Sequence, residues 1–196
     1  MTSATCVVRP TFPRSVGSER YSAGVPGPFA SNDDSDLRAA ERAVTDAFGG
    51  LPLDFHALLA VTNVFRAATA MRNHMEGRIL AEHQLSWSAF VSLFVLRVWG
   101  PQESHQLAAE AGVTGGTLTG VLNTLERRDF ARRTAHPRDG RRVIVKATAK
   151  GRRVVDAIMP QINREERLMT ADLDESERDE LSRLLRKVLR TLDDLD

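Results

Sequence analysis

Residues 104–148 read SHQLAAEAGVTGGTLTGVLNTLERRDFARRTAHPRDGRRVIVKAT, and this stretch decides the fold. The part from Ser104 to Arg128 has the spacing of two helices joined by a tight turn, as in a helix-turn-helix. Gly112 permits the positive φ that ends the first helix, and Thr114 is placed to cap the second. Four apolar residues are predicted to form the small core of this motif: Leu107, Val113, Leu118 and Val121.

The second helix of the motif is predicted to present small residues on the side opposite its apolar face. Its inward-facing residues are Leu118, Val121, Leu122 and Leu125. The residues left to face a DNA major groove are Gly115, Gly116, Thr117, Thr119, Gly120 and Asn123. Thr and Asn side chains bond to base edges or phosphates, and no Arg or Lys stands among the first groove-facing positions. Specificity is therefore expected to rely on threonine and asparagine contacts and on DNA shape.

A cationic two-stranded wing is predicted directly after this helix. Residues 132–135 and 142–148 read as its strands, and the segment HPRDGR at 136–141 has strong turn composition. Three arginines are expected at its tip: Arg138, Arg141 and Arg142. An arginine on a thin loop can enter a narrow minor groove, where the negative potential is focused. A solvated cationic hairpin is the alternative interpretation.

The charge distribution indicates a polyanionic partner for the middle of the chain. The formal net charge of the 196 residues is only +1. From Leu125 to Arg153, however, eleven basic residues stand against three acidic ones, which leaves a local net charge of +8. From Asn163 to Asp196 the balance reverses, with eleven acidic residues against seven basic ones. A basic segment of this kind favours a nucleic-acid partner.

The segments that flank the winged motif are predicted to be helical, so the expected fold class is mainly α with a helical dimerisation region. Apolar residues recur at three- and four-residue spacing from Asp54 to Ile79, which predicts a helix of about 27 residues and about 40 Å. Another helix is expected from Ser86, its N-cap, to Trp99. The predicted organisation is a disordered arm at 1–35, an accessory helix at 36–50 capped by Ser35, a dimerisation helix at 51–85, the winged helix-turn-helix at 86–148 and C-terminal dimerisation helices at 149–196.

Two helices are predicted to close the chain. The first runs from Ala149 to about Met169 and contains Pro160 as an expected kink. Asp174 and Glu177 form a capping-box-like start for the second. That helix carries a narrow apolar seam made of Leu181, Leu184, Leu185, Val188, Leu192 and Leu195. Because the seams exceed what one small core covers, a homodimer is expected, and an intramolecular bundle is the alternative.

Several classes of protein are not indicated by the sequence. Cys6 is the only cysteine, which excludes an intramolecular disulfide and a thiolate metal site and fits a reducing cytoplasm. No apolar run approaches the roughly 18 to 20 residues of a membrane span. The chain has no glycine-rich phosphate loop, paired catalytic carboxylates, metal-spaced histidines or nucleophile elbow. No enzymatic activity, cofactor or metal is therefore expected.

The order of these elements resembles the MarR (multiple-antibiotic-resistance regulator) family of transcription regulators. The similarity covers about Asp54 to Leu195 and is carried by QLAAEAGVTGGTLTGVLNTLE at 106–126 and HPRDGRRVIVKAT at 136–148. Asp139 and Arg141 match the Asp-x-Arg of the family's wing. The resemblance implies that Arg141 reaches the minor groove while Asp139 braces the wing. It also implies a triangular homodimer that binds a pseudo-palindromic operator and represses.

Two sets of site residues follow. The expected DNA-binding residues are Thr114, Gly115, Gly116, Thr117, Thr119, Asn123, Arg132, Arg138, Asp139, Arg141 and Arg142. By resemblance, a small aromatic or phenolic effector binds between the dimerisation helices and the winged domain and releases DNA. The residues expected to line that pocket are Met71, His74, Met75, Trp87 and Arg97, for which ordinary core packing is the alternative.

Two functions remain open from the sequence. The first is a sequence-specific, ligand-responsive regulator that binds double-stranded DNA. The second is a winged-helix module for protein interaction, which the missing basic residues of the second helix would allow. Thiol sensing is not expected, because Cys6 lies in the predicted disordered arm.

Overall fold

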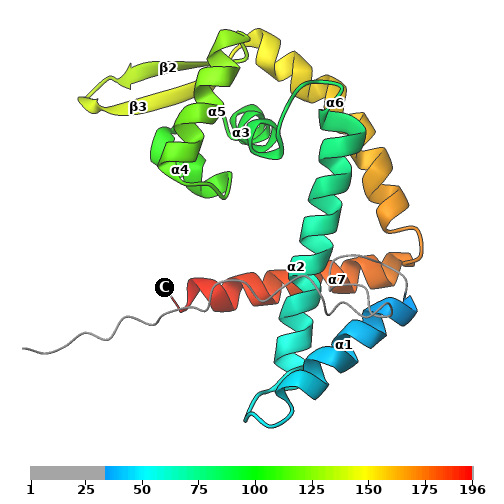
Figure 1. Cartoon of the computed structure of the whole chain (residues 1–196). Helices are drawn as coiled ribbons and strands as arrows, with labels where there is room; N and C mark the ends of the chain where they lie inside the picture. Colours follow the sequence, from blue (N-terminus) through cyan, green and yellow to red (C-terminus); the bar gives the residue numbers. More distant parts are fainter. Residues whose placement is uncertain (1–33, 196) are drawn as a thin grey trace, which may run out of the picture. The chain divides into compact units, whose positions relative to one another are not determined.

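The computed structural model describes residues 34–195, apart from the surroundings of Gly140 and the side chain of Arg141, and it is mainly helical with one small sheet (Figure 1). The predicted fold class, a mainly α winged helix-turn-helix, is confirmed. The chain falls into two units that divide inside helix α2, between Arg66 and Ala67. The predictions for the arm at 1–33 and for Cys6 lie outside the described residues.

The first unit contains α1 (Asp34–Phe48) and the beginning of α2 (Phe55–Met75). Because α1 already includes residues 34 and 35, the predicted N-cap at Ser35 is wrong, as is disorder at these two positions. The two helices are linked by a hydrogen bond of 2.8 Å from Asn63 Nδ2 to Glu41 Oε1. The predicted start of the long helix is confirmed, since the Asp54 carboxylate accepts a bond from the Ala57 amide.

Helix α2 continues into the π-helical turn η1 (Glu76–Leu80), so the long helix does reach Ile79. Only the last part of its apolar stripe is buried, at Met75 and Ile79. Helix α3 (Trp87–Val98) then forms the centre of the core of the second unit and packs against α4, α5, α6 and β3. The predicted N-cap is confirmed, because Ser86 Oγ accepts a bond of 3.2 Å from the Ala89 amide.

The wing belongs to a three-stranded antiparallel sheet of order β1-β3-β2, so the predicted two-stranded wing was incomplete. The strands are β1 (Gln102–Glu103), β2 (Ala131–His136) and β3 (Asp139–Ala147). Strand β1 has two residues, too few to show an alternating pattern. The predicted turn at 136–141 is also too long, because His136 already pairs with Asp139 across the turn.

Helices α6 (Ala149–Met169) and α7 (Glu175–Asp193) complete the second unit. Helix α6 is one helix through Pro160 and buries Val155, Ile158 and Ile162. The predicted capping box of α7, between Asp174 and Glu177, is confirmed. None of the described helices is long and apolar enough to cross a membrane, and no cluster of metal-ligating side chains occurs among residues 34–195.

Candidate nucleic-acid interface

The helix-turn-helix consists of α4 (Ser104–Glu110) and α5 (Gly115–Arg127), as predicted. Gly112 in the turn has φ +62°, a conformation that favours glycine. Thr114 caps α5, because its Oγ1 accepts a bond of 3.2 Å from the Thr117 amide. The turn chemistry that was expected from the sequence is therefore confirmed at both residues.

Helix α5 has one buried and one exposed face. Leu118, Leu122 and Leu125 are buried in the core, and Val121 is half-buried at its edge. The residues predicted to face DNA are all exposed: Thr114, Gly115, Gly116, Thr117, Thr119, Gly120 and Asn123. The Thr119 hydroxyl donates to the Gly115 carbonyl at 2.9 Å. The exposed face therefore consists mostly of glycines and of short side chains, and the Thr119 hydroxyl is bonded to the backbone of its own helix.

Packing within the chain does not require glycine at any of the three glycine positions of this exposed face. A Cβ atom at Gly115 or Gly120 would find nothing within 4 Å, and one at Gly116 would meet only Thr114 Oγ1 at 3.9 Å. Each glycine in a helix interior costs about 1 kcal/mol relative to alanine. Since the fold does not require them, these glycines leave room for the close approach of an external partner.

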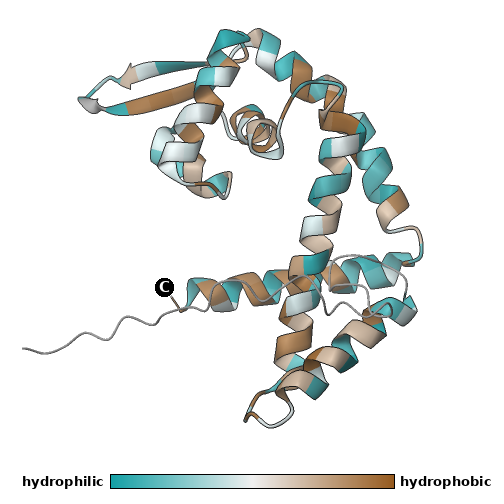
Figure 2. Ribbon diagram, in the orientation of Figure 1, coloured by the Kyte–Doolittle hydropathy of each residue, from teal (hydrophilic) through white to brown (hydrophobic). Residues whose placement is uncertain are grey.

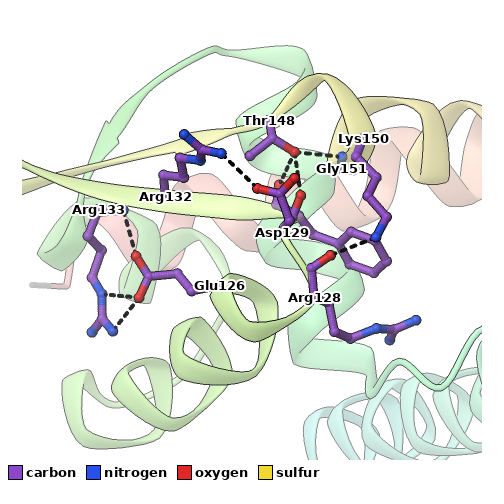
Figure 3. A network of polar contacts seen from close by, with 9 residues as sticks. Glu126, Arg128, Asp129, Arg132, Arg133, Thr148, Lys150 and Gly151 are labelled. Atoms are coloured by element: carbon purple, nitrogen blue, oxygen red, sulfur yellow. Dashed lines mark hydrogen bonds and ion pairs between the residues drawn. The ribbon is translucent and has the colours of Figure 1, made fainter.

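An ion pair fastens the wing to the end of α5. Arg133 of β2 donates to Glu126 from Nε at 3.0 Å and from Nη2 at 2.6 Å, and its backbone amide donates to the same carboxylate at 2.8 Å (Figure 3). The hydrogen bond from the Arg133 side chain lowers the pKa of Glu126 below its usual value, because it favours the charged carboxylate. The same guanidinium also donates to Asn123 Oδ1.

The root of the wing is the region where β2 and β3 meet the end of α5 and the start of α6. Side chains pack closely around Phe130 in this region. The Arg128 guanidinium lies 4.4 Å from the centre of this ring, and Lys150 Nζ lies 5.3 Å from it. Thr148 Oγ1 donates to the Asp129 carbonyl at 2.6 Å and accepts from the Gly151 amide at 3.0 Å (Figure 3). A Cβ atom at Gly151 would lie 2.0 Å from the Phe130 carbonyl oxygen, so only glycine fits there.

The cations of the wing occupy different environments. Arg132 is 66% exposed, forms an ion pair of 3.1 Å with Asp129, and stands directly across the strands from Lys146. Two cations at opposed positions repel each other, and an anionic partner would relieve this repulsion. Arg142 forms an ion pair with Glu103 of β1, in which Nε to Oε2 measures 2.7 Å. Arg138 is exposed in the turn, Asp139 begins β3, and the Arg141 side chain lies outside the described atoms.

The five predicted effector residues are spread over several environments of the second unit. Met75 is buried in the core, Trp87 packs at its edge, and Met71 is exposed. His74 Nε2 lies 2.7 Å from Glu165 Oε2, which lowers the pKa of Glu165. Arg97 forms an ion pair with Asp156. It also lines a surface hollow with Arg152 and Arg153, and the other four residues do not line that hollow. Their role in effector binding therefore stays a prediction.

Several residues of the interface were missed by sequence reasoning. Glu126 and Arg133 lie seven residues apart on different elements, and Glu103 lies far from Arg142 along the chain. No local spacing rule connects such pairs. Gly151 carried one usable signal, because a glycine within the first turns of a helix is costly and indicates a close contact.

A helix-turn-helix with an exposed second helix and an adjoining basic wing defines a winged-helix DNA-binding protein. The model of the MarR family matches residues 85–143. The chain is 32% identical over 165 residues to the HTH-type transcriptional regulator YwaE of Bacillus subtilis, covering 83% of this chain and 96% of YwaE. The chain therefore belongs to the MarR family of DNA-binding transcriptional regulators, and its function is regulatory rather than enzymatic.

Two further similarities concern regulators with a stated role. The transcriptional repressor NicR of Pseudomonas putida is 32% identical over 106 residues, which is 54% of this chain and 67% of NicR. The structure of BpsR of Bordetella bronchiseptica, whose DNA binding is regulated by 6-hydroxynicotinic acid, superposes with a TM-score of 0.60. BpsR is 25% identical, and the similarity covers 66% of this chain and 97% of BpsR.

Proposed function

We propose that this regulator is a cytoplasmic homodimer that represses transcription at a pseudo-palindromic operator and releases it when a small aromatic or phenolic effector binds. The exposed, glycine-rich face of α5 beside a basic wing carries this proposal. In it, α5 enters the major groove and the wing arginines follow the phosphates into the neighbouring minor groove. Asp139 and Arg141 at the start of β3 take the roles that the family resemblance implies.

The apolar side of α7 supports the dimer. None of its residues from Glu175 to Asp193 is buried, although the helix is long and well capped. Hydrophobic stretches along α7 appear brown in Figure 2. The exposed apolar residues of this helix are Leu181, Leu184, Leu185, Val188, Leu189 and Leu192. A second copy that covers this seam would remove the apolar surface from water. Two α5 helices about 34–36 Å apart would then reach successive turns of the DNA.

Regulation by an effector follows from differential affinity. A ligand that binds better to a dimer with a changed spacing of the two α5 helices weakens operator binding. The repressor NicR and the regulation of BpsR by 6-hydroxynicotinic acid support a repressor that responds to an aromatic acid. The effector pocket we propose is the one expected from the sequence, between the dimerisation helices and the winged domain.

A titration of full-length protein against its own upstream DNA, monitored by fluorescence anisotropy, tests the proposal. We expect a preference for one pseudo-palindromic site and a stoichiometry of two chains per site. Equal affinity for unrelated DNA would instead support the protein-interaction module.

The dimer is tested by Leu185→Asp, which places a charge in the seam. Sedimentation should show a monomer with a retained cooperative unfolding transition and at least about tenfold weaker operator binding, because each half-site is then bound alone. Arg186→Asp, on another side of α7, is the control and should remain dimeric. A dimeric Leu185→Asp variant would contradict the assignment of this interface.

A further inference from the structure

Asn123 occupies a distinctive place on the exposed face of α5. It follows Gly116 and Gly120 at seven and three residues, so the three lie on one stripe of the helix. The two glycines carry no side chain, and Asn123 is exposed. Thr119 lies on the same stripe, but its hydroxyl already donates to the Gly115 carbonyl, so Asn123 carries the longest polar side chain of the stripe.

The orientation of the Asn123 amide is set by Arg133. Arg133 Nη2 lies 2.5 Å from Asn123 Oδ1, and the same guanidinium is held by Glu126 through two further bonds of 3.0 Å and 2.6 Å. A guanidinium has only N–H donors, so the amide atom that faces it has to be the oxygen. The Asn123 amide therefore turns its NH₂ group, a pure donor, away from Arg133.

Base edges differ in what they require from such an amide. Adenine presents an acceptor at N7 and a donor at N6, and an asparagine satisfies both only when its own oxygen is available. Guanine presents two acceptors, N7 and O6, which suit a donor group. Arg133 uses one of the two lone pairs of the Asn123 oxygen, whereas both N–H groups of the amide stay free, so the amide suits the two acceptors of guanine better than the mixed edge of adenine.

We propose that Arg133 is a specificity-determining residue, which holds Asn123 as a hydrogen-bond donor and so directs α5 to a guanine in each operator half-site. This inference rests on the proposed function, in which α5 enters the major groove. Arg133 itself stays at the base of the wing and acts through Asn123. Glu126 anchors the guanidinium, so the wing and the reading helix specify the base together.

The test is a selection of binding sites by full-length protein from a randomised DNA library, followed by competition binding with single-base variants of the selected site. The wild type should prefer guanine over adenine by about tenfold at one position of each half-site. Arg133→Met, which frees the Asn123 oxygen, should move that preference to adenine. In an Asn123→Ala background, the same change should leave the position without preference.

Asn123→Asp provides a second arm, because it leaves an acceptor oxygen toward Arg133 and replaces the amide NH₂ group by a second carboxylate oxygen. It replaces the donor group by an acceptor, so the preferred base should become cytosine, whose N4 group donates. Arg132→Met, on the other face of β2 and paired with Asp129, is the matched control and should weaken binding to all sites equally.

The outcomes separate this inference from the proposed function. If the wild type shows no sequence preference at all, the proposed function fails. If the wild type is sequence-specific but Arg133→Met and Asn123→Asp keep its base preference, the role of Arg133 is overturned and the proposed function stands. Thermal unfolding of each variant identifies losses of affinity that come from loss of fold.

Discussion

The root of the wing and the exposed face of α5 adjoin each other but are built in opposite ways. At the root, Arg133 and Glu126 share several hydrogen bonds, and Gly151 touches the Phe130 backbone so closely that no larger residue fits. On the exposed face, a Cβ atom at Gly120 would meet nothing within 4 Å, and the Thr119 hydroxyl bonds to its own helix. The difference shows that side-chain contacts hold the wing against α5, whereas the exposed face of α5 makes few contacts within the chain, as the proposed approach of DNA to this face requires.

The largest effect is expected at the root, from Gly151→Ala. The added Cβ would lie 2.0 Å from the Phe130 carbonyl oxygen, so the start of α6 has to move away from the wing. Overpacking of this kind costs about 1–3 kcal/mol of unfolding free energy, and a backbone clash belongs at the upper end. Chemical denaturation measures the loss, and a variant as stable as the wild type would refute the tight fit.

The same substitution should have the opposite sign on the exposed face. Gly120→Ala has open space for its Cβ and should raise the unfolding free energy by about 1 kcal/mol. It should also weaken operator binding, because the methyl group would separate the helix from the base edges. Denaturation and anisotropy on the same sample check both signs. A more stable variant with unchanged affinity would show that DNA does not approach this face closely.

Arg132, an exposed cation of β2 paired with Asp129, offers a smaller effect. Arg132→Ala should reduce the slope of log affinity against log salt concentration by about one, as expected for one lost phosphate contact. Arg183→Ala on α7, paired with Glu180 and far along the chain from the wing, is the control and should leave the slope unchanged. An Arg132→Ala slope equal to that of the wild type would remove this residue from the DNA interface.

The smallest effect concerns the pH dependence of the root. Because the pKa of Glu126 is lower in the folded state, its pairing stabilises the fold above the usual carboxylate pKa and is lost as the pH falls through the lowered value. Between about pH 5 and pH 3, the wild type should lose more stability than Glu126→Gln, which cannot titrate. Parallel melting curves compare the two. Identical acid sensitivity would mean that this pair contributes nothing.

Whether a feature of this chain could be predicted from the sequence depended on how far apart its residues lie along the chain. The caps at Thr114 and Ser86 and the capping box at Asp174 were predictable, because each bond joins residues within three positions of each other. Strand β1 was missed, since two residues carry no periodic signal. Arg142 was expected at an open tip, whereas its ion pair with Glu103 requires β1 to lie beside β3.

The sequence by itself determined the helix-turn-helix, the two longer strands of the wing and the residue types on the exposed face of α5, because helix periodicity, capping and turn chemistry act over short distances along the chain. Only the tertiary structure decided how Asn123 is oriented, why Gly151 is required and which arginines are already paired. Those features depend on groups that meet from different elements. The tertiary structure also showed that packing within the chain does not require the glycines of α5, which the sequence alone could not decide.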